Sequence, residues 1–270
     1  MSTIRNKIAL ITGAASGIGK LMGDLLLQKG LQTLVIWDIN EGMMESTAKG
    51  LKERGFNVFA YCVDIANPTA MHAAAALIKK DVGKIDILIN NAGIIVGKSF
   101  LNHSEQEIES TMRINVTAMM YLTKIFLAEM IATNEGHVIN IASAAGMTSN
   151  PNMSVYVASK WAVIGWSDSL YLEMKKIKSA VCVTTVTPYY INTGMFDGVK
   201  SKVIPILQPA VAAKKIIRGI ENNKRFVRMP GIVYILFFVR GILPASWFDR
   251  VVGQWMGVYH SMDEFKGRSI

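Results

Sequence analysis

Three residues in the middle of the chain have the types and spacing of an acid–base site: Ser143, Tyr156 and Lys160. Tyr156 and Lys160 are four residues apart, so on a helix they would lie on the same face. A positive charge beside a phenol favours the phenolate, and we therefore expect Lys160 to lower the pKa of Tyr156 from about 10. The pair alone is not specific, because a surface tyrosine and lysine at this spacing are equally compatible with the pattern.

The flanking residues predict the elements that would position these side chains. Residues 137–142 form a short apolar run with β-branched side chains, which is typical of a buried strand and would deliver Ser143 at its carboxyl end. Residues 155–175 have the apolar spacing of a helix, which would present Tyr156 and Lys160 one turn apart.

A glycine-rich turn near the N-terminus predicts a dinucleotide site. It follows a predicted strand at residues 7–12 and contains Gly13, Gly17 and Gly19, after which a helical pattern continues to Gln28. In this order of elements the turn lets the backbone approach a pyrophosphate, and the helix N-terminus favours the anion. The spacing is Gly-x-x-x-Gly-x-Gly, which differs from the usual Gly-x-Gly-x-x-Gly, so a purely structural turn remains an alternative.

Asp38 ends the next predicted strand, nineteen residues after Gly19. A carboxylate at this place can accept hydrogen bonds from both ribose hydroxyls of NAD, and it repels the 2′-phosphate of NADP. No arginine or lysine occupies the turn or the position just after Asp38, so we expect NAD rather than NADP. The alternative role for Asp38, as N-cap of a helix from Glu41, does not exclude the first.

Strand and helix patterns alternate through the first two thirds of the chain, with further strands predicted at 58–63 and 85–90 and helices from Pro68 and over 105–129. This order predicts an α/β fold, a Rossmann-type doubly wound parallel sheet with helices on both faces. Such sheets bind ligands beyond the carboxyl ends of their strands. Residues at predicted strand ends are therefore site candidates: Gly13, Asp38, Asp64, Asn91 and Ser143.

Together these motifs resemble the short-chain dehydrogenase/reductase family. The matching segments lie in the family's order between about residues 5 and 195: residues 12–19, Asp64, residues 90–93, Asn115, Ser143, residues 156–160, and Pro188 with Thr193. The resemblance implies a Rossmann-fold, NAD(P)-dependent oxidoreductase. One departure is that Tyr189 and Tyr190 follow Pro188, where the family often has glycine, and this predicts a differently shaped loop on the nicotinamide side.

The resemblance also implies roles for individual residues. Tyr156 would be the catalytic acid/base, Lys160 would lower its pKa and hydrogen-bond the nicotinamide ribose, and Ser143 would hold the substrate oxygen. Asn115 would support a water-mediated proton relay, although from its place in a predicted helix it could equally be a packing residue. The cofactor site would comprise Gly13, Ser16, Gly17, Ile18, Gly19, Asp38, Asp64, Ile65, Asn91, Ala92, Gly93, Tyr156, Lys160, Pro188 and Thr193.

Three later segments, residues 192–196, 204–209 and 261–268, resemble one branch of the family more specifically. That branch contains retinol dehydrogenases and 17β-hydroxysteroid dehydrogenases associated with membranes or lipid droplets, which implies a lipophilic substrate: a retinoid, a steroid or a long-chain alcohol or aldehyde. The branch's usual N-terminal apolar anchor is missing from this sequence. We therefore expect a cytoplasmic protein whose contact with a membrane, if any, is peripheral.

The composition predicts one globular domain over residues 1–270, in which residues 196–270 form a substrate lid and an apolar C-terminal extension. Of the residues, 51% are apolar and 18% charged, which excludes a disordered chain. Cys62 and Cys182 are expected to be buried, reduced thiols, and the four histidines are too scattered to predict a metal site. We expect the chain to form a homodimer or homotetramer.

The net charge of +9 is concentrated near the C-terminus. From Val199 onward the chain has 12 of its 29 basic residues but only 4 of its 20 acidic residues. The apolar run at 230–239 is interrupted by Arg240 and Pro244, too early for the roughly 20 residues that span a membrane. A membrane-surface patch, a dimer surface and core completion all remain open, whereas no motif accompanies the basic residues to indicate nucleic-acid binding.

Two other functions are compatible with this sequence. One is an NADPH-dependent reductase of small polar carbonyls, which cofactor preference would distinguish. The other is a non-catalytic dinucleotide-binding module that docks on membranes or partners. The presence of Ser143, Tyr156 and Lys160 together argues against the module, because binding alone does not require all three.

Overall fold

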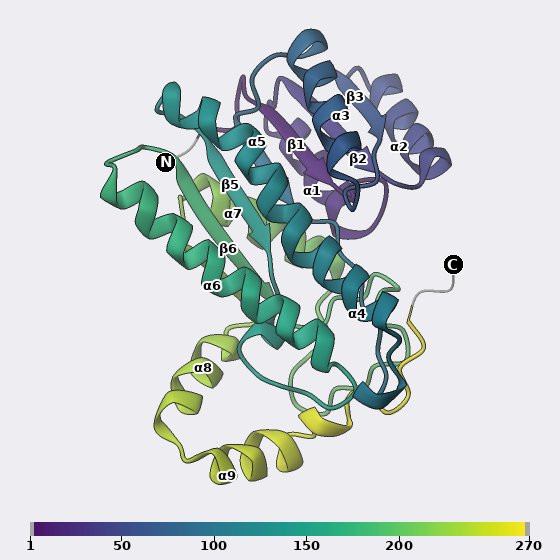
Figure 1. The fold of residues 1–270 in the computed structure, drawn as a ribbon, viewed down its shortest axis with the longest axis vertical. Coiled ribbons are helices and arrows are strands. Elements are labelled where there is room, and N and C mark those ends of the chain that lie inside the picture. Colours follow the sequence, from purple (N-terminus) through teal and green to yellow (C-terminus); the bar gives the residue numbers. More distant parts are fainter. Residues whose placement is uncertain (1–2, 268–270) are drawn as a thin grey trace.

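Seven parallel strands form one sheet across residues 3–267, the part of the chain that the computed structural model describes (Figure 1). The predicted domain ends at residues 1 and 270, and Arg268 of the closing motif, lie outside this range. The strand order is β3-β2-β1-β4-β5-β6-β7, so the direction in which strands are added reverses between β1 and β4. The strands are β1 (Ile8–Thr12), β2 (Thr33–Asp38), β3 (Val58–Cys62), β4 (Ile87–Asn90), β5 (His137–Ile141), β6 (Cys182–Pro188) and β7 (Phe226–Met229).

Helices cover both faces of the sheet, which confirms the predicted doubly wound α/β fold (Figure 1). Strand side chains alternate between two cores, because successive residues of a strand point to opposite faces. Ile11 and Ile36 pack in one core with α1 (Gly17–Gln28), α2 (Glu41–Glu53) and α7 (Pro209–Glu221). Leu10 and Val35 pack in the other with α3 (Pro68–Asp81), α5 (Ala118–Ala132) and α6 (Ser154–Lys176).

The long helix predicted over residues 105–129 is interrupted in the structure. It consists of α4 (Glu105–Met112), a π-helical turn at Arg113–Thr117, and then α5. The turn contains Asn115, whose buried side chain accepts a hydrogen bond from the Ile94 amide at 2.8 Å and donates one to the Ile94 carbonyl at 2.9 Å. The apolar periodicity of the sequence does not reveal such a bulge, because the bulge inserts only one residue into an otherwise helical pattern.

Among the described residues, the same continuous segment, Glu105–Ala132, is the one helix long and apolar enough to cross a membrane by length and composition. Its inner side chains, including Leu122 and Phe126, are buried against the sheet. We therefore interpret it as a core helix, since an apolar helix that covers a sheet has the same composition.

Both cysteines are thiols, but their predicted burial was wrong. Cys62 is exposed because it ends β3, the strand at the edge of the sheet, and Cys182 is half-buried at the start of β6. Both residues are thus in strands, as expected, yet at strand ends where less protein covers them.

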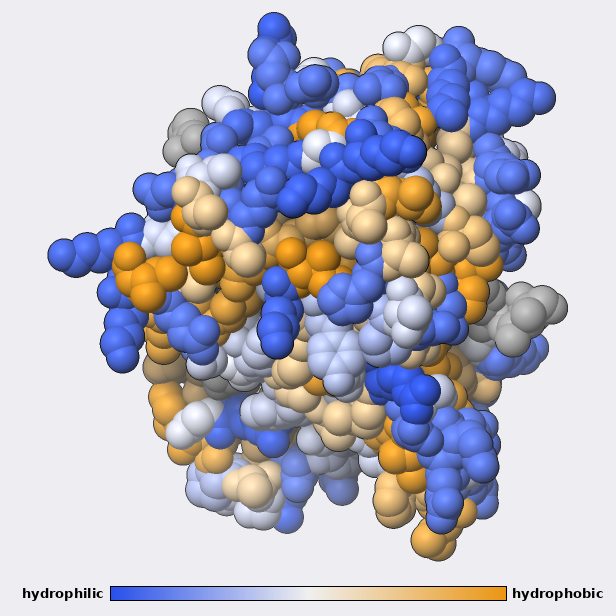
Figure 2. Space-filling view, turned by 45° about the horizontal axis from the view of Figure 1, so that its top comes forward, coloured by the Kyte–Doolittle hydropathy of each residue, from blue (hydrophilic) through white to orange (hydrophobic). Residues whose placement is uncertain are grey.

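Beyond the sheet the chain continues as a C-terminal extension of α8 (Ile232–Ile242), α9 (Ala245–Phe248), a π-helical segment Asp249–Trp255 and a short helix Val258–His260. Figure 1 shows α8 and α9 projecting below the sheet, away from the N-terminal half. Hydrophobic residues come to the surface in patches between hydrophilic ones, as one face of the molecule shows (Figure 2).

Candidate functional site

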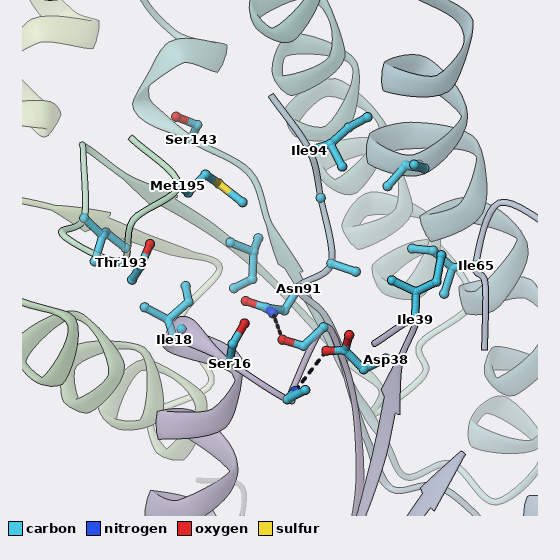
Figure 3. Close-up of a pocket in the computed structure, with 18 of the residues that line it drawn as sticks. Ser16, Ile18, Asp38, Ile39, Ile65, Asn91, Ile94, Ser143, Thr193 and Met195 are labelled. Atoms are coloured by element: carbon cyan, nitrogen blue, oxygen red, sulfur yellow. Dashed lines mark hydrogen bonds between the residues drawn. The ribbon is translucent and has the colours of Figure 1, made fainter. Parts of the chain in front are cut away.

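A cavity of about 610 Å³ opens at the carboxyl ends of the strands, beside the reversal in strand order. Figure 3 shows Asp38, Ile39 and Ile65 gathered at one end and Ser143 and Met195 at the other. This is the edge where a doubly wound sheet places its ligand.

The cavity brings together most of the residues that the sequence singled out. Its lining includes Gly13, Ser16, Gly17, Ile18, Asp38, Asp64, Ile65, Asn91, Ala92, Gly93, Ser143, Tyr156, Lys160, Pro188 and Thr193. Two candidates do not line it. Gly19 lies beneath the turn, where a Cβ would clash with the Gly13 carbonyl, and Asn115 lies behind Gly93.

Sequence reasoning missed several apolar residues of the lining, among them Ile39, Met43, Ile94 and Ile114, whereas Tyr189, Met195 and Phe196 belong to the loop and lid that it predicted near the substrate. Some carried a signal, since Ile39 directly follows a predicted strand end and Ile94 directly follows residues 90–93. Ile39 is 68% exposed in this structure, which is unusual for an isoleucine so close to a sheet.

Hydrogen bonds join the glycine-rich turn to the end of β4. The Thr12 hydroxyl accepts from the Asn91 and Ala92 amides, each at 3.0 Å, and the Asn91 amide group donates to the Thr12 and Gly13 carbonyls at 2.9 and 3.1 Å. Gly13 has a φ of +64°, and a Cβ on it would lie only 3.0 Å from Ala92 Cα. The turn can approach β4 this closely because the residue is glycine.

This turn suits a pyrophosphate. The first turn of α1 faces the cavity, so its unpaired amides and the helix dipole favour an anion. Gly17 has a φ of +57°, and the nearest neighbour of a Cβ there would be Thr193, at 3.8 Å. The backbone therefore stays open to a bound phosphate at this point.

The Asp38 carboxylate lies between the turn and the cavity. One oxygen accepts from the Ala15 amide at 2.9 Å (Figure 3). The other accepts from the Asn40 amide at 3.0 Å. The N-cap of α2 is Asn40, whose side chain accepts from the Met43 amide. The capping role considered for Asp38 is thus wrong, and its carboxylate supports the turn instead.

At the other end of the cavity, the Ser143 side chain lies beside Tyr156 and acts to lower its pKa, while the Ser143 hydroxyl donates to the Pro188 carbonyl at 3.5 Å. The Ser143 oxygen also accepts from the Ala145 amide at 3.1 Å, which fixes its direction. Lys160 Nζ lies 5.5 Å from the centre of the Tyr156 ring and donates to the Ile141 carbonyl at 3.0 Å. The three side chains therefore lie together, as expected when a strand end is followed by a helix.

The expected pKa of Tyr156 was wrong in direction. Burial raises the pKa of Tyr156 above 10, and the hydrogen bond from Ser143 opposes this rise only in part. Burial also lowers the pKa of Lys160 from 10.5 to about 8. Desolvation disfavours both charged forms, and the Lys160 amine is directed at the Ile141 carbonyl rather than at the phenol oxygen.

Asn115 connects the loop after β4 to the helix that carries Tyr156 and Lys160. Its Nδ2 donates to Ser159 Oγ at 3.1 Å as well as to the Ile94 carbonyl. A Cβ on Gly93 would lie 3.1 Å from Asn115 Oδ1 and 3.8 Å from Lys160 Nζ. Asn115 is therefore a positioning residue in this structure.

The predicted lid and the end of the chain enclose the Tyr156 end of the cavity. Phe196 of the lid packs 6.1 Å from the Tyr156 ring, centre to centre, and 5.0 Å from Tyr190. The Tyr190 hydroxyl hydrogen-bonds Ser261 Oγ at 2.9 Å, and Asn150 Nδ2 donates to the same oxygen at 2.8 Å. The lid residues are also tied to the chain end through main-chain bonds from Lys200 to Ser261 and from Lys266 to Asp197.

Comparisons with known proteins agree with this geometry. The family model described as short chain dehydrogenase matches residues 7–203. Epidermal retinol dehydrogenase 2 of Homo sapiens is 36% identical over 267 residues, covering 97% of this chain and 86% of the relative. Estradiol 17-beta-dehydrogenase 11 of Homo sapiens is 32% identical over 263 residues, covering 93% of this chain and 87% of the relative.

Two solved structures are similar in fold. A short-chain dehydrogenase/reductase from Burkholderia phymatum in complex with NAD has a TM-score of 0.81 at 24% identity, covering 90% of this chain and 96% of the other. A short-chain dehydrogenase from Sphingobium yanoikuyae in complex with NADPH has a TM-score of 0.76 at 25% identity, covering 93% and 94%.

The buried amine predicts a pH-dependent stability. The unfolded chain keeps the proton of Lys160 up to about pH 10.5, whereas the folded chain loses it above about pH 8. The folded state thus binds fewer protons between these values, and stability rises with pH there. Relative to Lys160→Met, the free energy of unfolding of the parent protein should increase by on the order of 3 kcal/mol from pH 8 to 10.5.

Chemical denaturation across this pH range measures the difference. The matched control is Lys49→Met on α2, whose side chain is exposed and whose difference from the parent should not change with pH. A difference for Lys160→Met that stays flat from pH 8 to 10.5 would contradict the lowered pKa.

Proposed function

The chain belongs to the short-chain dehydrogenase family of oxidoreductases, and on that premise we propose that it uses NAD(H) to interconvert a hydroxyl and a carbonyl on a lipophilic substrate. The substrate class is a retinoid, a steroid or a long-chain alcohol or aldehyde. The observation that carries the proposal is one continuous cavity, with the turn and Asp38 at one end and the Tyr156–Ser143 pair at the other.

The acid–base part of the reaction follows from the two paired hydroxyls. A bound nicotinamide supplies or accepts the hydride. Ser143 holds the substrate oxygen, and Tyr156 donates a proton to that oxygen in reduction or removes one in oxidation. Because Tyr156 and Ser143 line the same cavity side by side, one substrate oxygen can contact both hydroxyls.

Lys160 and Asn115 support this proton transfer. Lys160 has a pKa of about 8, so its amine can carry or release a proton near neutral pH. In the proposal it also hydrogen-bonds the nicotinamide ribose, and Asn115 supports a relay through water. Both Lys160 and Asn115 neighbour Gly93, and because Gly93 has no side chain, both lie close to the cavity that it lines.

The lipophilic substrate is supported by the lining around Ser143. Ile94, Tyr189, Met195 and Phe196 present apolar surface at this end of the cavity. A lining of apolar side chains with few polar groups binds apolar ligands and orients them through the few hydrogen bonds available. The names of the relatives, a retinol dehydrogenase and an estradiol dehydrogenase, agree with this class.

The preference for NAD is supported by charge. The Asp38 carboxylate faces the cavity, and among the lining residues the structure describes, the one basic side chain is Lys160, near Tyr156 at the opposite end. A 2′-phosphate near Asp38 would therefore meet a negative charge and no compensating cation.

Two alternatives have specific tests. An NADPH-dependent reductase of small polar carbonyls would turn over such carbonyls with NADPH rather than lipophilic ones with NADH. A non-catalytic dinucleotide-binding module would bind cofactor and show no turnover with any carbonyl or alcohol. Tyr156 and Ser143 are both buried side chains that line the cavity, which favours the enzyme over both a module and an incidental surface pair.

Replacing Tyr156 by phenylalanine tests the mechanism. Tyr156→Phe keeps the ring and removes the hydroxyl that moves the proton, so turnover of lipophilic aldehydes with NADH should fall by about 100-fold or more. Steady-state NADH oxidation measures turnover, and NADH fluorescence titration should show that the cofactor still binds. Tyr121→Phe, on the exposed side of α5, is the matched control. Near-normal turnover of Tyr156→Phe would overturn the assignment.

Removing the charge of Asp38 tests the cofactor preference. Asp38→Asn keeps an oxygen that can accept from the Ala15 amide but removes the repulsion of a 2′-phosphate, so the ratio of kcat/KM for NADP to that for NAD should rise by roughly tenfold or more. Asp38→Ala, which also releases the turn, should weaken the binding of both cofactors. An unchanged ratio in Asp38→Asn would contradict the role of the charge.

We further propose that the extension meets a membrane surface peripherally and that the enzyme is a homodimer or homotetramer on the cytoplasmic side. Large apolar side chains of the extension are exposed; we define the apolar C-terminal face as Tyr234, Ile235, Phe238, Ile242, Trp247 and Trp255. Trp255 is 80% exposed, and Arg250 is exposed nearby in sequence. Aromatic and basic side chains together suit an anionic interface.

Vesicle co-sedimentation tests the membrane contact. Vesicles containing phosphatidylserine should bind the protein better than vesicles of phosphatidylcholine alone. The double variant Phe238→Ser/Trp247→Ser should lower binding by about tenfold or more, because two large apolar side chains no longer enter the interface. Leu77→Ser, at an exposed leucine on α3, is the matched control. Equal binding by the double variant and the control would contradict this contact.

A further inference from the structure

A second, much smaller cavity of about 10 Å³ lies between the segment after Ser143 and the C-terminal extension. Its lining is mainly apolar and consists of Ala144, Met147, Thr148, Tyr189, Ile204, Val233, Val252 and Val258. The Thr148 hydroxyl already donates to the Ala144 carbonyl at 3.3 Å. With so few polar partners, this space suits a methylene group rather than a water molecule.

Tyr189 lines both cavities, and among the described residues no other side chain is common to the two linings. Its ring therefore stands between the substrate end of the catalytic cavity and the space beneath α8. The residue directly precedes Tyr190, whose ring centre lies 4.6 Å away in an edge-on arrangement.

Several contacts hold the Tyr189 ring in this place. Its main-chain amide donates to the Met229 carbonyl at 2.8 Å. Its hydroxyl hydrogen-bonds Ser201 Oγ at 3.2 Å, and that serine in turn donates to the Ile204 carbonyl at 2.5 Å. Tyr189 is thus fixed to β7 through its main chain and to the lid through its hydroxyl.

We propose that Tyr189 is the partition that ends the chain-binding part of the catalytic cavity, and that the apolar space beneath α8 is its continuation. Tyr189 then sets the longest unbranched aliphatic chain that fits behind the reacting oxygen. This inference rests on the proposed function only in requiring that the site binds a lipophilic alcohol or aldehyde.

The physical consequence is a limit to the gain in affinity with chain length. Each methylene buried in an apolar cavity contributes about 0.8 kcal/mol, which is about fourfold in the dissociation constant. Affinity should rise by this factor per carbon until the chain reaches the Tyr189 ring, and longer chains should gain little because their ends stay in water.

The experiment measures dissociation constants of n-alkan-1-ols of increasing length for the enzyme–NADH complex, by calorimetric titration. The alcohol cannot be oxidised by NADH, so the assay reports binding without turnover. In Tyr189→Ala the plateau should move to chains longer by about two carbons or more, each still contributing about fourfold. Tyr189→Phe keeps the ring and should keep the plateau of the parent protein.

A second variant locates the added space. Val233 is buried on α8 and lines only the small cavity, so Tyr189→Ala/Val233→Phe should refill that space and return the plateau to shorter chains. NADH titration verifies that each variant is folded. If Tyr189→Ala does not fold, Tyr189→Leu should move the plateau in the same direction, toward longer chains, but by fewer carbons.

The outcomes separate this inference from the proposed function. If the parent complex binds no alkanol of any length, the lipophilic-substrate proposal fails and the partition fails with it. If the parent shows the rise and plateau but Tyr189→Ala or Tyr189→Leu leaves the plateau unchanged, Tyr189 is not the partition while the proposed function stands. A shifted plateau that Val233→Phe does not reverse would place the added chain elsewhere and overturn the continuation beneath α8.

Discussion

The hydrogen bonds between Thr12 and Asn91 are the constraint on which the site depends. They join the end of β1 to the end of β4, the two strands between which the order of the sheet reverses. The glycine-rich turn follows one strand and Gly93 follows the other, so this junction sets the distance between that turn and the side chains of Ser143, Tyr156 and Lys160. Gly13 permits the close approach of the turn to the end of β4, and Gly19 lets α1 pack directly beneath the turn.

Burial governs the chemistry at the other end of the cavity. Tyr156 and Lys160 are both enclosed, and desolvation moves their pKa values apart, upward for the phenol and downward for the amine. The neutral forms of both side chains are therefore favoured, and the phenol keeps its proton more firmly than an ordinary tyrosine beside an ordinary lysine. The enclosure comes in part from the chain end, through Ser261 and the lid residue Phe196.

Local patterns predicted the parts of the structure that depend on local sequence. Strands, helices and the polar residues at strand ends follow from short apolar runs and their breaks, so the fold and the position of Asp38, Ser143 and Tyr156 at one edge could be derived. The π-helical turn at Asn115 could not, because it leaves the apolar spacing nearly unchanged and depends on bonds to Ile94.

Other features depend on contacts between distant residues. The bond between Tyr190 and Ser261 joins positions 71 residues apart, and the apolar lining around Ser143 comes from several loops. Asn40 rather than Asp38 caps α2 because the carboxylate is already engaged by the Ala15 amide. The pKa of Tyr156 rose rather than fell for the same reason: spacing shows which residues share a helix face, but not how far they are buried or what else the amine contacts.

In the proposed complex, one cavity holds the substrate oxygen between Tyr156 and Ser143 while Asp38 holds the far end of the cofactor. The most direct measurement is a crystal structure of the protein with NADH and a long-chain alcohol. We expect the alcohol oxygen within about 3.2 Å of both Tyr156 Oη and Ser143 Oγ, with the adenosine ribose at Asp38. An alcohol oxygen that contacts neither hydroxyl, or a cofactor bound in the reverse direction, would contradict it.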